Sequence, residues 1–391
     1  NQDRKNPVTA QKVALGKLLF FETGLAQASK KSVSLNTYSC SSCHVPEKGF
    51  TAGRFQGIAD GGVGFGVQGE GRYKNISYDG SEVDAQGARP LPVINLTFVR
   101  NALWSGAFGA NGMNVGTESA WGVADSLTNI NKKGFEGLEA NNTRALFVHR
   151  QVVTEELMTK LGLKKMFDEA FGDIPVSERY TPQMASNAIA AYFRTILTNE
   201  APFQKWLKGD KNAMTVQQKK GGELFFGKAG CINCHNSPSF NNQKFAAIGV
   251  YNLFQIGGGK SVFRTDAKDL RNKGRGGFTL RDQDLYKFKV PQLYNLKDVG
   301  FYFHGGSKES LKDVIEYFNL AIPENPNVPS DRIDPLFKPR NLTNTEKEDL
   351  LAFLENGLHD DNLVRYKPGF IMSGFCFPNN DLQSRQDMGC K

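Results

Sequence analysis

The stretch GKAGCINCHNSPSF occupies residues 227–240, and at its centre a cysteine pair is followed directly by a histidine. The same arrangement occurs in SCSSCH, residues 39–44, near the other end of the chain. The residues concerned are Cys40, Cys43 and His44 in the first copy and Cys231, Cys234 and His235 in the second. Thiols and imidazoles are metal-binding and redox-active groups, so this repeated motif decides how the rest of the chain is interpreted.

Cys-x-x-Cys-His is the attachment signature of c-type haem. The two thiols add to the porphyrin vinyl groups, and the histidine that follows becomes the proximal ligand of the iron. Two alternatives are a zinc site shared by both cysteine pairs and a thioredoxin-like dithiol. A zinc site leaves both histidines unexplained, and no βαβ pattern surrounds either pair. The sequence therefore predicts two covalently bound haem c groups.

Composition limits the function classes. The 391 residues are enough for two domains, and 39% hydrophobic residues are enough for their cores. The net charge of +8 is spread along the chain as isolated doublets, without a basic and aromatic strip, which argues against nucleic-acid binding. No apolar run is long enough to span a membrane. We expect a globular protein whose diffuse positive charge steers an acidic protein partner.

The remaining two cysteines, Cys376 and Cys390, lie in a tail rich in Pro, Asn, Asp and Gly. Such a tail has little core of its own, and two leftover cysteines near each other are typical of a disulfide staple. A disulfide requires an oxidising compartment.

The surroundings of the two motifs also repeat. LGKLLFFETG (15–24) and GGELFFGKAG (221–230) precede them, and LPVINLTFVRNALWSG (91–106) and VPQLYNLKDVGFYFHGG (290–306) follow. This pattern predicts a mainly α protein made of two cytochrome c-like haem domains related by internal duplication, with long loops and a disulfide-stapled C-terminal tail. Trp104 and His304 would then occupy equivalent places. The polar, proline-containing residues 170–182 suggest a boundary, with domains at 1–175 and 176–391.

Local patterns support helices. Residues 187–206 have apolar side chains at helical spacing, interrupted by Pro202, and Ser310 and Thr343 are predicted N-caps. Residues 60–72 contain Gly-x-Gly-x-x-Gly, but no strand clearly precedes it and no helix clearly follows. We therefore expect a flexible loop there, not a dinucleotide site.

The ordered set of motifs resembles the bacterial dihaem cytochrome c peroxidase/MauG family over most of the chain. The resemblance rests on LGKLLFF, CSSCHVPEKGFTAGR, LWSG, FQKWLKGD, ELFFGKAGCINCHNSPSF, VPQLYNLKDVGFYFHGGS and DLLAFLENGL. It implies a peroxide-reactive N-terminal haem with proximal His44, an electron-transferring C-terminal haem with proximal His235, and a periplasmic location. It also implies a bridging tryptophan at Trp104, although Ser105 replaces the aspartate of the family's Trp-Asp-Gly motif.

Around the first haem, this sequence departs from the family. No histidine occurs between His44 and His149, so the loop that caps this iron in many members has no imidazole here, and we expect an open or water-filled sixth position. The family also places an acid near this iron to move a proton during O–O cleavage. An apparent insertion leaves Glu139, Glu136 and the pair His149/Gln151 as candidates. The alternatives are that both glutamates are surface charges and that His149 is a buried structural histidine.

For the second haem, the family uses a methionine or tyrosine fourteen residues after the histidine of its Tyr-x-His motif. That count from His304 reaches Phe318, which cannot ligate iron. Tyr317 is one position earlier, and a one-residue shift turns a helical side chain by about 100°. Tyr317 is our first candidate for the sixth ligand; the alternatives are His304, no side-chain ligand, or Tyr317 as ordinary helix packing.

The family's calcium site is doubtful in this sequence. The resemblance places an asparagine ligand where this chain has Pro90, and Val299 and Phe301 replace the usual Thr and Pro. Backbone carbonyls survive such changes, but the asparagine side chain does not.

We therefore expect an oxidoreductase that reacts with hydrogen peroxide at the first haem and shares oxidising equivalents through Trp104 with the second. Its electrons would come from a small redox protein, or from residues of a partner protein that it modifies, as in MauG-type enzymes; the missing capping histidine and methionine favour the second. The alternatives are a pure dihaem electron-transfer cytochrome and a haem oxygenase acting on a hydrophobic polymer. A homodimer is one open possibility for the assembly.

Overall fold

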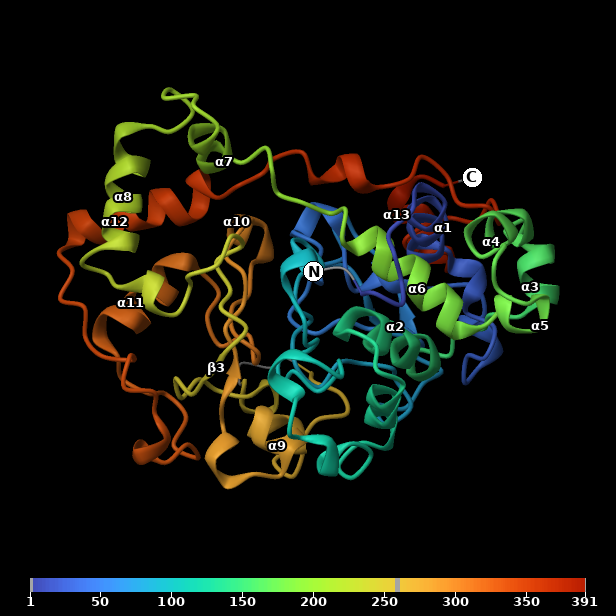
Figure 1. The fold of residues 1–391 in the computed structure, drawn as a ribbon, viewed down its shortest axis with the longest axis horizontal. Helices are drawn as coiled ribbons and strands as arrows, with labels where there is room; N and C mark the ends of the chain where they lie inside the picture. The colour runs from blue at the N-terminus through green and yellow to red at the C-terminus, as the bar shows by residue number, and fades with distance from the viewer. Residues whose placement is uncertain (1–2, 257–260, 391) are drawn as a thin grey trace.

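The computed structural model describes residues 3–256 and 261–390, and the fold is mainly helical. Figure 1 shows the N-terminal half of the chain on one side and most of the C-terminal half on the other, with the C-terminal tail returning across the top to end beside α1 and α4. The helices of the first half are α1 (Ala10–Phe21), α2 (Gly137–Val148), α3 (Glu155–Lys160), α4 (Lys164–Ala170), α5 (Val176–Arg179) and α6 (Pro182–Phe193). Those of the second are α7 (Pro202–Leu207), α8 (Val216–Phe226), α9 (Arg275–Thr279), α10 (Leu296–Val299), α11 (Leu311–Leu320), α12 (Asn344–Ala352) and α13 (Leu382–Met388).

The strands are very short. β1 (Gly62–Val63) pairs antiparallel with β2 (Tyr73–Lys74), and β3 (Phe245–Ala246) pairs antiparallel with β4 (Phe288–Lys289). Long loops, as predicted, and 3-10 segments connect the helices.

The same helix crossing occurs twice. α1 packs on α6, and α8 packs on α12. A Cβ placed on Gly16 of α1 would lie 2.0 Å from the carbonyl oxygen of Ala188, and one placed on Gly221 of α8 would lie 2.0 Å from that of Asp349. Only glycine allows backbones to approach so closely. The glycine therefore fixes an equivalent crossing in each half, one turn before the Phe-Phe pair that leads to each cysteine motif.

The predicted caps are confirmed. The Ser310 side chain accepts a hydrogen bond from the backbone N–H of Asp313, and Thr343 forms a capping box with Glu346. The predicted helical segment 187–206 is split by the structure: α6 begins earlier, at Pro182, and ends at Phe193. Pro202 is the first residue of α7, where its missing N–H costs nothing.

The glycine-rich segment 60–72 is a loop, as predicted, apart from the two-residue strand β1, and three of its backbone N–H groups bond the C-terminal tail. The N–H of Gly64 donates to Asp381 Oδ1 at 2.9 Å, and those of Phe65 and Gly66 donate to Asp387 Oδ2 at 2.7 and 2.8 Å. These acceptors belong to the C-terminal tail, so the loop binds the chain's own carboxylates.

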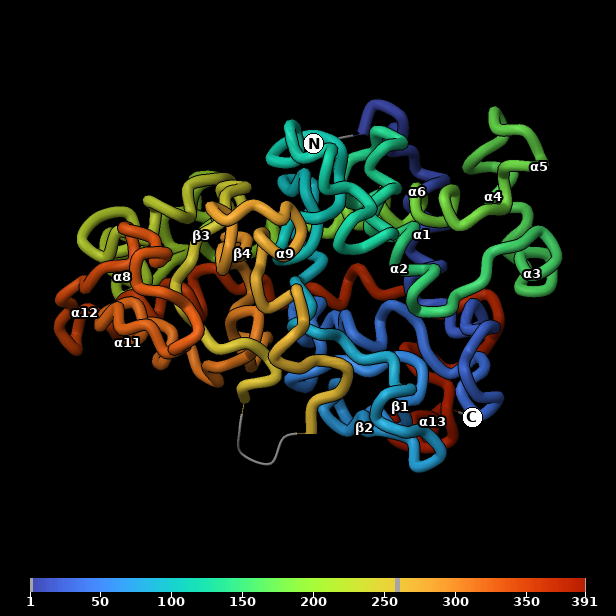
Figure 2. The backbone as a smooth tube through the Cα atoms, turned by 90° about the horizontal axis from the view of Figure 1, so that it is seen from below, coloured from blue at the N-terminus to red at the C-terminus, as the bar shows by residue number. Residues whose placement is uncertain are grey.

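The tail is stapled by the predicted Cys376–Cys390 disulfide, which the structure confirms. It packs on the N-terminal half: Arg72 pairs with Asp381, and Figure 2 shows α13 beside β1. The helix α6 also packs mainly on α1 and α2. The division into 1–175 and 176–391 stays a prediction; this packing favours an N-terminal unit that includes α6 and the tail.

Candidate haem sites

The first cysteine motif forms a single 3-10 turn, Cys40–Ser42, which Ser39 and Ser42 close with a capping box. The backbone N–H of His44 donates to the carbonyl oxygen of Cys40 at 3.2 Å. This bond holds the two cysteines and the histidine together in one compact turn. Nδ1 of His44 is 2.9 Å from the carbonyl oxygen of Phe50. A proton on Nδ1 satisfies that carbonyl and leaves Nε2 free to ligate a metal. Burial lowers the pKa of His44 to about 4, which keeps the ring neutral, as a ligand must be.

The second motif repeats this arrangement. Its turn is Cys231–Asn233, the N–H of His235 bonds the carbonyl oxygen of Cys231 at 2.9 Å, and Nδ1 of His235 is 2.6 Å from the carbonyl oxygen of Phe240. Phe50 and Phe240 both adopt positive φ, 57° and 60°, and burial lowers the pKa of His235 to about 4. The local geometry of one proximal histidine is thus reproduced at the other.

The four motif cysteines are free thiols, unlike the tail pair. Burial raises the pKa of Cys40, Cys43 and Cys231 to about 12. A dithiol oxidoreductase needs a thiolate with a lowered pKa, so these surroundings argue against the thioredoxin alternative.

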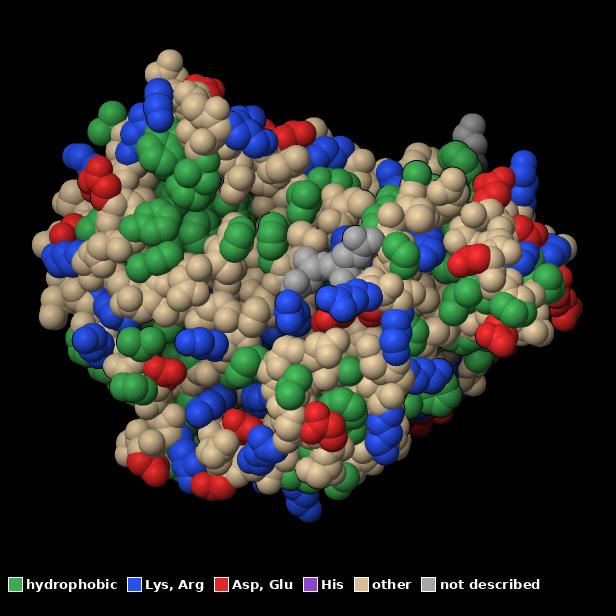
Figure 3. Space-filling model, in the orientation of Figure 1, with side chains coloured by type: hydrophobic (Ala, Val, Ile, Leu, Met, Phe, Trp, Pro, Cys, Tyr) green, Lys and Arg blue, Asp and Glu red, His purple; other side chains and the backbone are tan. Residues whose placement is uncertain are grey.

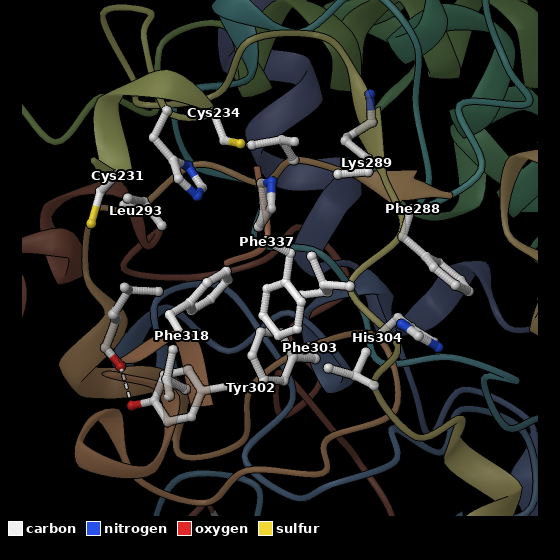
Figure 4. A pocket seen from close by; sticks show the side chains of 18 of the residues that line it. Cys231, Cys234, Phe288, Lys289, Leu293, Tyr302, Phe303, His304, Phe318 and Phe337 are labelled. Carbon is white, nitrogen blue, oxygen red and sulfur yellow. Dashed lines mark hydrogen bonds between the residues drawn. The ribbon is translucent and has the colours of Figure 1, made fainter. Parts of the chain in front are cut away.

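A cavity with about 1800 Å³ of space free of protein atoms, its open mouth included, adjoins the second motif. Figure 4 shows the sulfur atoms of Cys231 and Cys234 at one end and the rings of Phe303, Phe318 and Phe337 toward the other. Most of the lining is aliphatic or aromatic, which suits the flat apolar body of a porphyrin.

Two buried cations on the cavity wall fit the porphyrin's two carboxylates. Nη2 of Arg89 and Nζ of Lys289 find no hydrogen-bond partner within the part of the chain that the structure describes. Burial lowers the pKa of Arg89 to about 9 and that of Lys289 to about 7, since a buried charge lacks the solvation of water. An anionic group on the cofactor would supply the missing partners. The residues present therefore fit a covalently bound haem at the second motif.

Arg89 and Lys289 also occupy equivalent places in the internal repeat. Each one donates a backbone hydrogen bond to the other half of the repeat. The N–H of Arg89 donates to the carbonyl oxygen of His304, and the N–H of Lys289 donates to that of Trp104, both at 2.8 Å. The isolated bridges Ala102–Phe108 and Tyr302–Lys308 flank the two aromatic residues in the same way. The prediction that Trp104 and His304 occupy equivalent places is confirmed.

Trp104 lies between the halves. Its Nε1–H donates to the carbonyl oxygen of Arg89 at 2.7 Å, its ring centroid is 6.1 Å from that of His304 in an edge-to-face arrangement, and it lines the cavity of the second motif. Its indole is therefore fixed by the segment that carries the buried arginine.

The acid candidates have different surroundings. Glu139 is buried and accepts two hydrogen bonds from Arg194, at 2.6 and 3.0 Å, and one from Asn6 at 2.8 Å. This pairing holds its carboxylate as part of the α2–α6 packing. Glu136 is half-buried: its Oε1 accepts a hydrogen bond from Asn111 at 3.2 Å, and its Oε2 is buried without a partner among the described residues. Burial raises the pKa of Glu136.

The pair His149/Gln151 lies near the first motif. The thiol of Cys40 donates to Oε1 of Gln151 at 3.6 Å, and Nδ1 of His149 is 2.7 Å from Oδ2 of the buried Asp84. Burial alone would raise the pKa of Asp84. The charge of His149, the hydrogen bond from His149 and the charge of Arg150 together outweigh burial, so the pKa of Asp84 lies below its usual value. Sequence reasoning missed Asp84, since no local pattern marks it.

The candidate sixth ligands are engaged elsewhere in this structure. Tyr317 donates to the carbonyl oxygen of Ile248 at 2.5 Å, and the described residues that line the cavity include Phe318 and not Tyr317. As folded, Tyr317 packs as an ordinary helix residue, and ligation would require its hydroxyl to leave Ile248. His304 does line the cavity, but its Nε2 is 2.9 Å from Oδ1 of Asn252 and its ring is stacked on Phe288.

No cluster of three or more metal-binding side chains (His, Cys, Asp or Glu) occurs within residues 3–256 and 261–390. Over the same ranges, every helix is too short or too polar to cross a membrane.

Two cysteine–histidine motifs of equivalent geometry on a duplicated helical scaffold define a dihaem c-type protein. The family model described as "Di-haem cytochrome c peroxidase" matches residues 10–212, just over half of the chain. The chain belongs to this family and is a haem oxidoreductase of the cytochrome c peroxidase and MauG type.

Individual relatives agree. The methylamine utilization protein MauG of Methylorubrum extorquens is 29% identical, with 90% of this chain and 79% of the relative covered. The cytochrome-c peroxidase IdrP1 of Denitromonas iodatirespirans is also 29% identical, with coverage of 90% and 82%. A crystal structure of a MauG-like protein associated with microbial copper homeostasis superposes with a TM-score of 0.62 at 24% identity, over 92% of each chain, which shows the shared fold.

Proposed function

We propose that this protein reacts with hydrogen peroxide at a haem held by Cys40, Cys43 and His44. It shares the oxidising equivalents through Trp104 with a second haem held by Cys231, Cys234 and His235. When bound, the two haems would supply the redox chemistry, because two irons together can provide the two electrons that peroxide reduction requires. The chain orients the haems, keeps the proximal histidines neutral and links the two sites.

The position of Trp104 is the observation that carries this proposal. Its indole N–H bonds the carbonyl oxygen of Arg89, in the same half of the chain. Its backbone carbonyl accepts from the N–H of Lys289, and its ring packs edge-to-face on that of His304, both in the other half. These contacts hold an oxidisable ring in one orientation between the repeats. A rigid placement is what repeated charge transfer requires, because a displaced group must reorganise at each step.

At the first site, we assign the proton-handling role to His149 and Gln151. The Asp84 carboxylate holds Nδ1 of His149, which leaves Nε2 as the atom that gives or accepts a proton. Gln151 contacts the thiol that would join the haem edge, and its amide is a donor that does not change charge. The ion pair of Glu139 with Arg194 makes that carboxylate a structural residue in this proposal.

We propose that the electrons come from a protein partner in the periplasm. Hydrophobic side chains gather over α7 and α8 (Figure 3), where Leu207, Val216 and Phe226 are exposed, and Lys and Arg side chains lie around them. An apolar patch with a basic margin fits an acidic protein surface. The partner is either a small redox protein or, as the missing capping histidine favours, a protein whose own residues are oxidised.

The test is Trp104→Phe, with Trp121→Phe as the matched control. Trp121 is buried in a separate apolar cluster, where it donates to Thr117 at 3.1 Å, and it is absent from the cavity lining. One equivalent of peroxide is added to the oxidised protein, and the two haems are followed by rapid-scan absorbance and freeze-quench EPR. We expect slower charge sharing in Trp104→Phe and unchanged kinetics in Trp121→Phe. Equal kinetics in both variants and the natural protein would remove Trp104 from the pathway.

A second experiment separates the two kinds of partner. Steady peroxide reduction with a reduced small cytochrome or cupredoxin indicates a peroxidase. Slow decay of the oxidised protein, together with new cross-links or hydroxylation in a co-purifying protein, indicates a protein-modifying enzyme.

A further inference from the structure

The helix α11 turns a continuous apolar face to the cavity beside the second motif. Leu311, Val314, Ile315 and Phe318 line that cavity, at the spacing of one helix face. Tyr317 lies about 100° around the helix from Phe318 and is not among the described residues that line the cavity. Its ring packs against two residues that do line it, with centroids 5.1 Å from that of Phe337 and 5.6 Å from that of Phe303. The register of α11 therefore presents carbon atoms, and no oxygen, nitrogen or sulfur donor, from these four positions.

A cluster of phenylalanines continues this apolar wall. The ring centroid of Phe318 is 6.2 Å from that of Phe303 and 5.6 Å from that of Phe337, and Figure 4 shows all three rings facing the hollow on the side away from the two cysteine sulfurs. Val250 extends the wall. A haem tethered to Cys231 and Cys234 and held by His235 from that end of the hollow would have these rings on its other side.

Two cavity-lining side chains that could ligate iron, those of Tyr302 and His304, are occupied. The hydroxyl of Tyr302 donates to the carbonyl oxygen of Leu296 at 2.8 Å. His304 has its Nε2 beside Asn252, and its ring lies flat on Phe288 with centroids 3.5 Å apart. Moving His304 to the iron would break both contacts. Neither residue is a free donor toward the phenylalanine wall.

We propose that the second haem, held as in the proposed function, has no side-chain ligand opposite His235, and that the Phe303–Phe318–Phe337 wall forms a binding pocket for a small uncharged ligand there. An apolar wall admits neutral molecules of a few atoms and excludes anions, which would lose their hydration without gaining a hydrogen bond. The second haem site is then a ligand-binding site in addition to an electron-transfer site.

Carbon monoxide is the probe, used with the reduced holoprotein, and the variants are Phe318→Met, Tyr317→Phe and His304→Gln. Methionine at 318 places a thioether, a known axial haem ligand, where the phenylalanine ring lies. Tyr317→Phe removes only the hydroxyl bonded to Ile248 and is the matched control. The number of carbon monoxide molecules bound per chain is measured by titration, and the ferric spin states are measured by EPR.

We expect Phe318→Met to bind one fewer carbon monoxide than the natural protein and to gain one low-spin ferric signal. Tyr317→Phe and His304→Gln should leave the spin states unchanged. Loss of a low-spin signal in either of those two variants would identify the true ligand and overturn the inference, as would a natural protein whose second haem binds no carbon monoxide. Haem content and peroxide consumption, measured on the same samples, test the proposed function separately, because they do not depend on the second haem's open side.

Discussion

The two helix crossings make a sharp prediction about adjacent glycines in α8. Gly221 and Gly222 share one helix and one solvent environment, but only Gly221 meets the partner backbone. A Cβ at 221 would lie 2.0 Å from the carbonyl oxygen of Asp349, whereas a Cβ at 222 would lie 3.5 Å from the ring of Phe353, an ordinary contact. Gly221→Ala must therefore push α8 and α12 apart by about 1 Å, and Gly222→Ala need move nothing.

The expected magnitude follows from two opposing effects. Alanine favours a helix over glycine by about 1 kcal/mol, and both variants gain this. Overpacking costs about 1–3 kcal/mol, and only Gly221→Ala incurs it. The two variants should thus differ by about 1–3 kcal/mol in the free energy of unfolding, with Gly222→Ala at least as stable as the natural protein.

The assay is thermal unfolding of the holoproteins by far-UV circular dichroism, where about 2–4 °C corresponds to each kcal/mol for a domain of this size. Gly16→Ala in α1 should behave like Gly221→Ala, because its Cβ would also lie 2.0 Å from a carbonyl oxygen, that of Ala188. A Gly221→Ala protein that melts at or above Gly222→Ala would refute the close backbone contact at Gly221, and a Gly16→Ala protein that melts like the natural one would refute the equivalence of the two crossings.

Three further predictions concern stability. Glu139→Gln should lower the free energy of unfolding by about 3–5 kcal/mol, because it leaves its buried arginine partner uncompensated; activity loss at unchanged melting temperature would instead indicate a catalytic acid. Cys376→Ser with Cys390→Ser should lose about 3 kcal/mol, as expected for a closed loop of this length, and reduction with dithiothreitol should reproduce the loss in the natural protein only. The stability that Asp84 contributes is present at neutral pH and is lost as the pH falls through its lowered folded pKa. The gap in melting temperature between the natural protein and Asp84→Asn should therefore shrink below about pH 4, and a constant gap would show that the His149 contact is not electrostatic.

Much of the architecture was predictable because its signals are local or repeated. Short spacings, which can be read from the sequence, mark three features: the two Cys-x-x-Cys-His motifs, the helix caps at Ser310 and Thr343, and the tail disulfide. The match between Trp104 and His304 came from comparing the two halves, and reciprocal backbone bonds in the structure explain it. The helix break before Pro202 was visible as a proline, although the true start of α6 at Pro182 was missed.

The sequence named His149 and Gln151 among the distal candidates but could not choose between that pair and the two glutamates, because long-range packing decides the choice. Gln151 reaches Cys40 across 111 positions of sequence, and no pattern marks the partner of such a contact. The family spacing, counted from His304, reached Phe318, and its neighbour Tyr317 was the nearest possible ligand. Only the packing of α11 decides which of these two side chains faces the cavity. Arg89 and Lys289 were overlooked because a single cation in an apolar segment has no distinctive motif; their importance comes from burial without a partner.

The central claim is that the chain carries two c-type haems and that the first has a side open to hydrogen peroxide. EPR of the oxidised holoprotein, recorded before and after one equivalent of peroxide, tests it most directly. We predict a high-spin ferric signal, accounting for at least one haem per chain, that disappears when peroxide is added and returns on reduction. Two low-spin ferric haems whose signals do not change with peroxide would contradict the account.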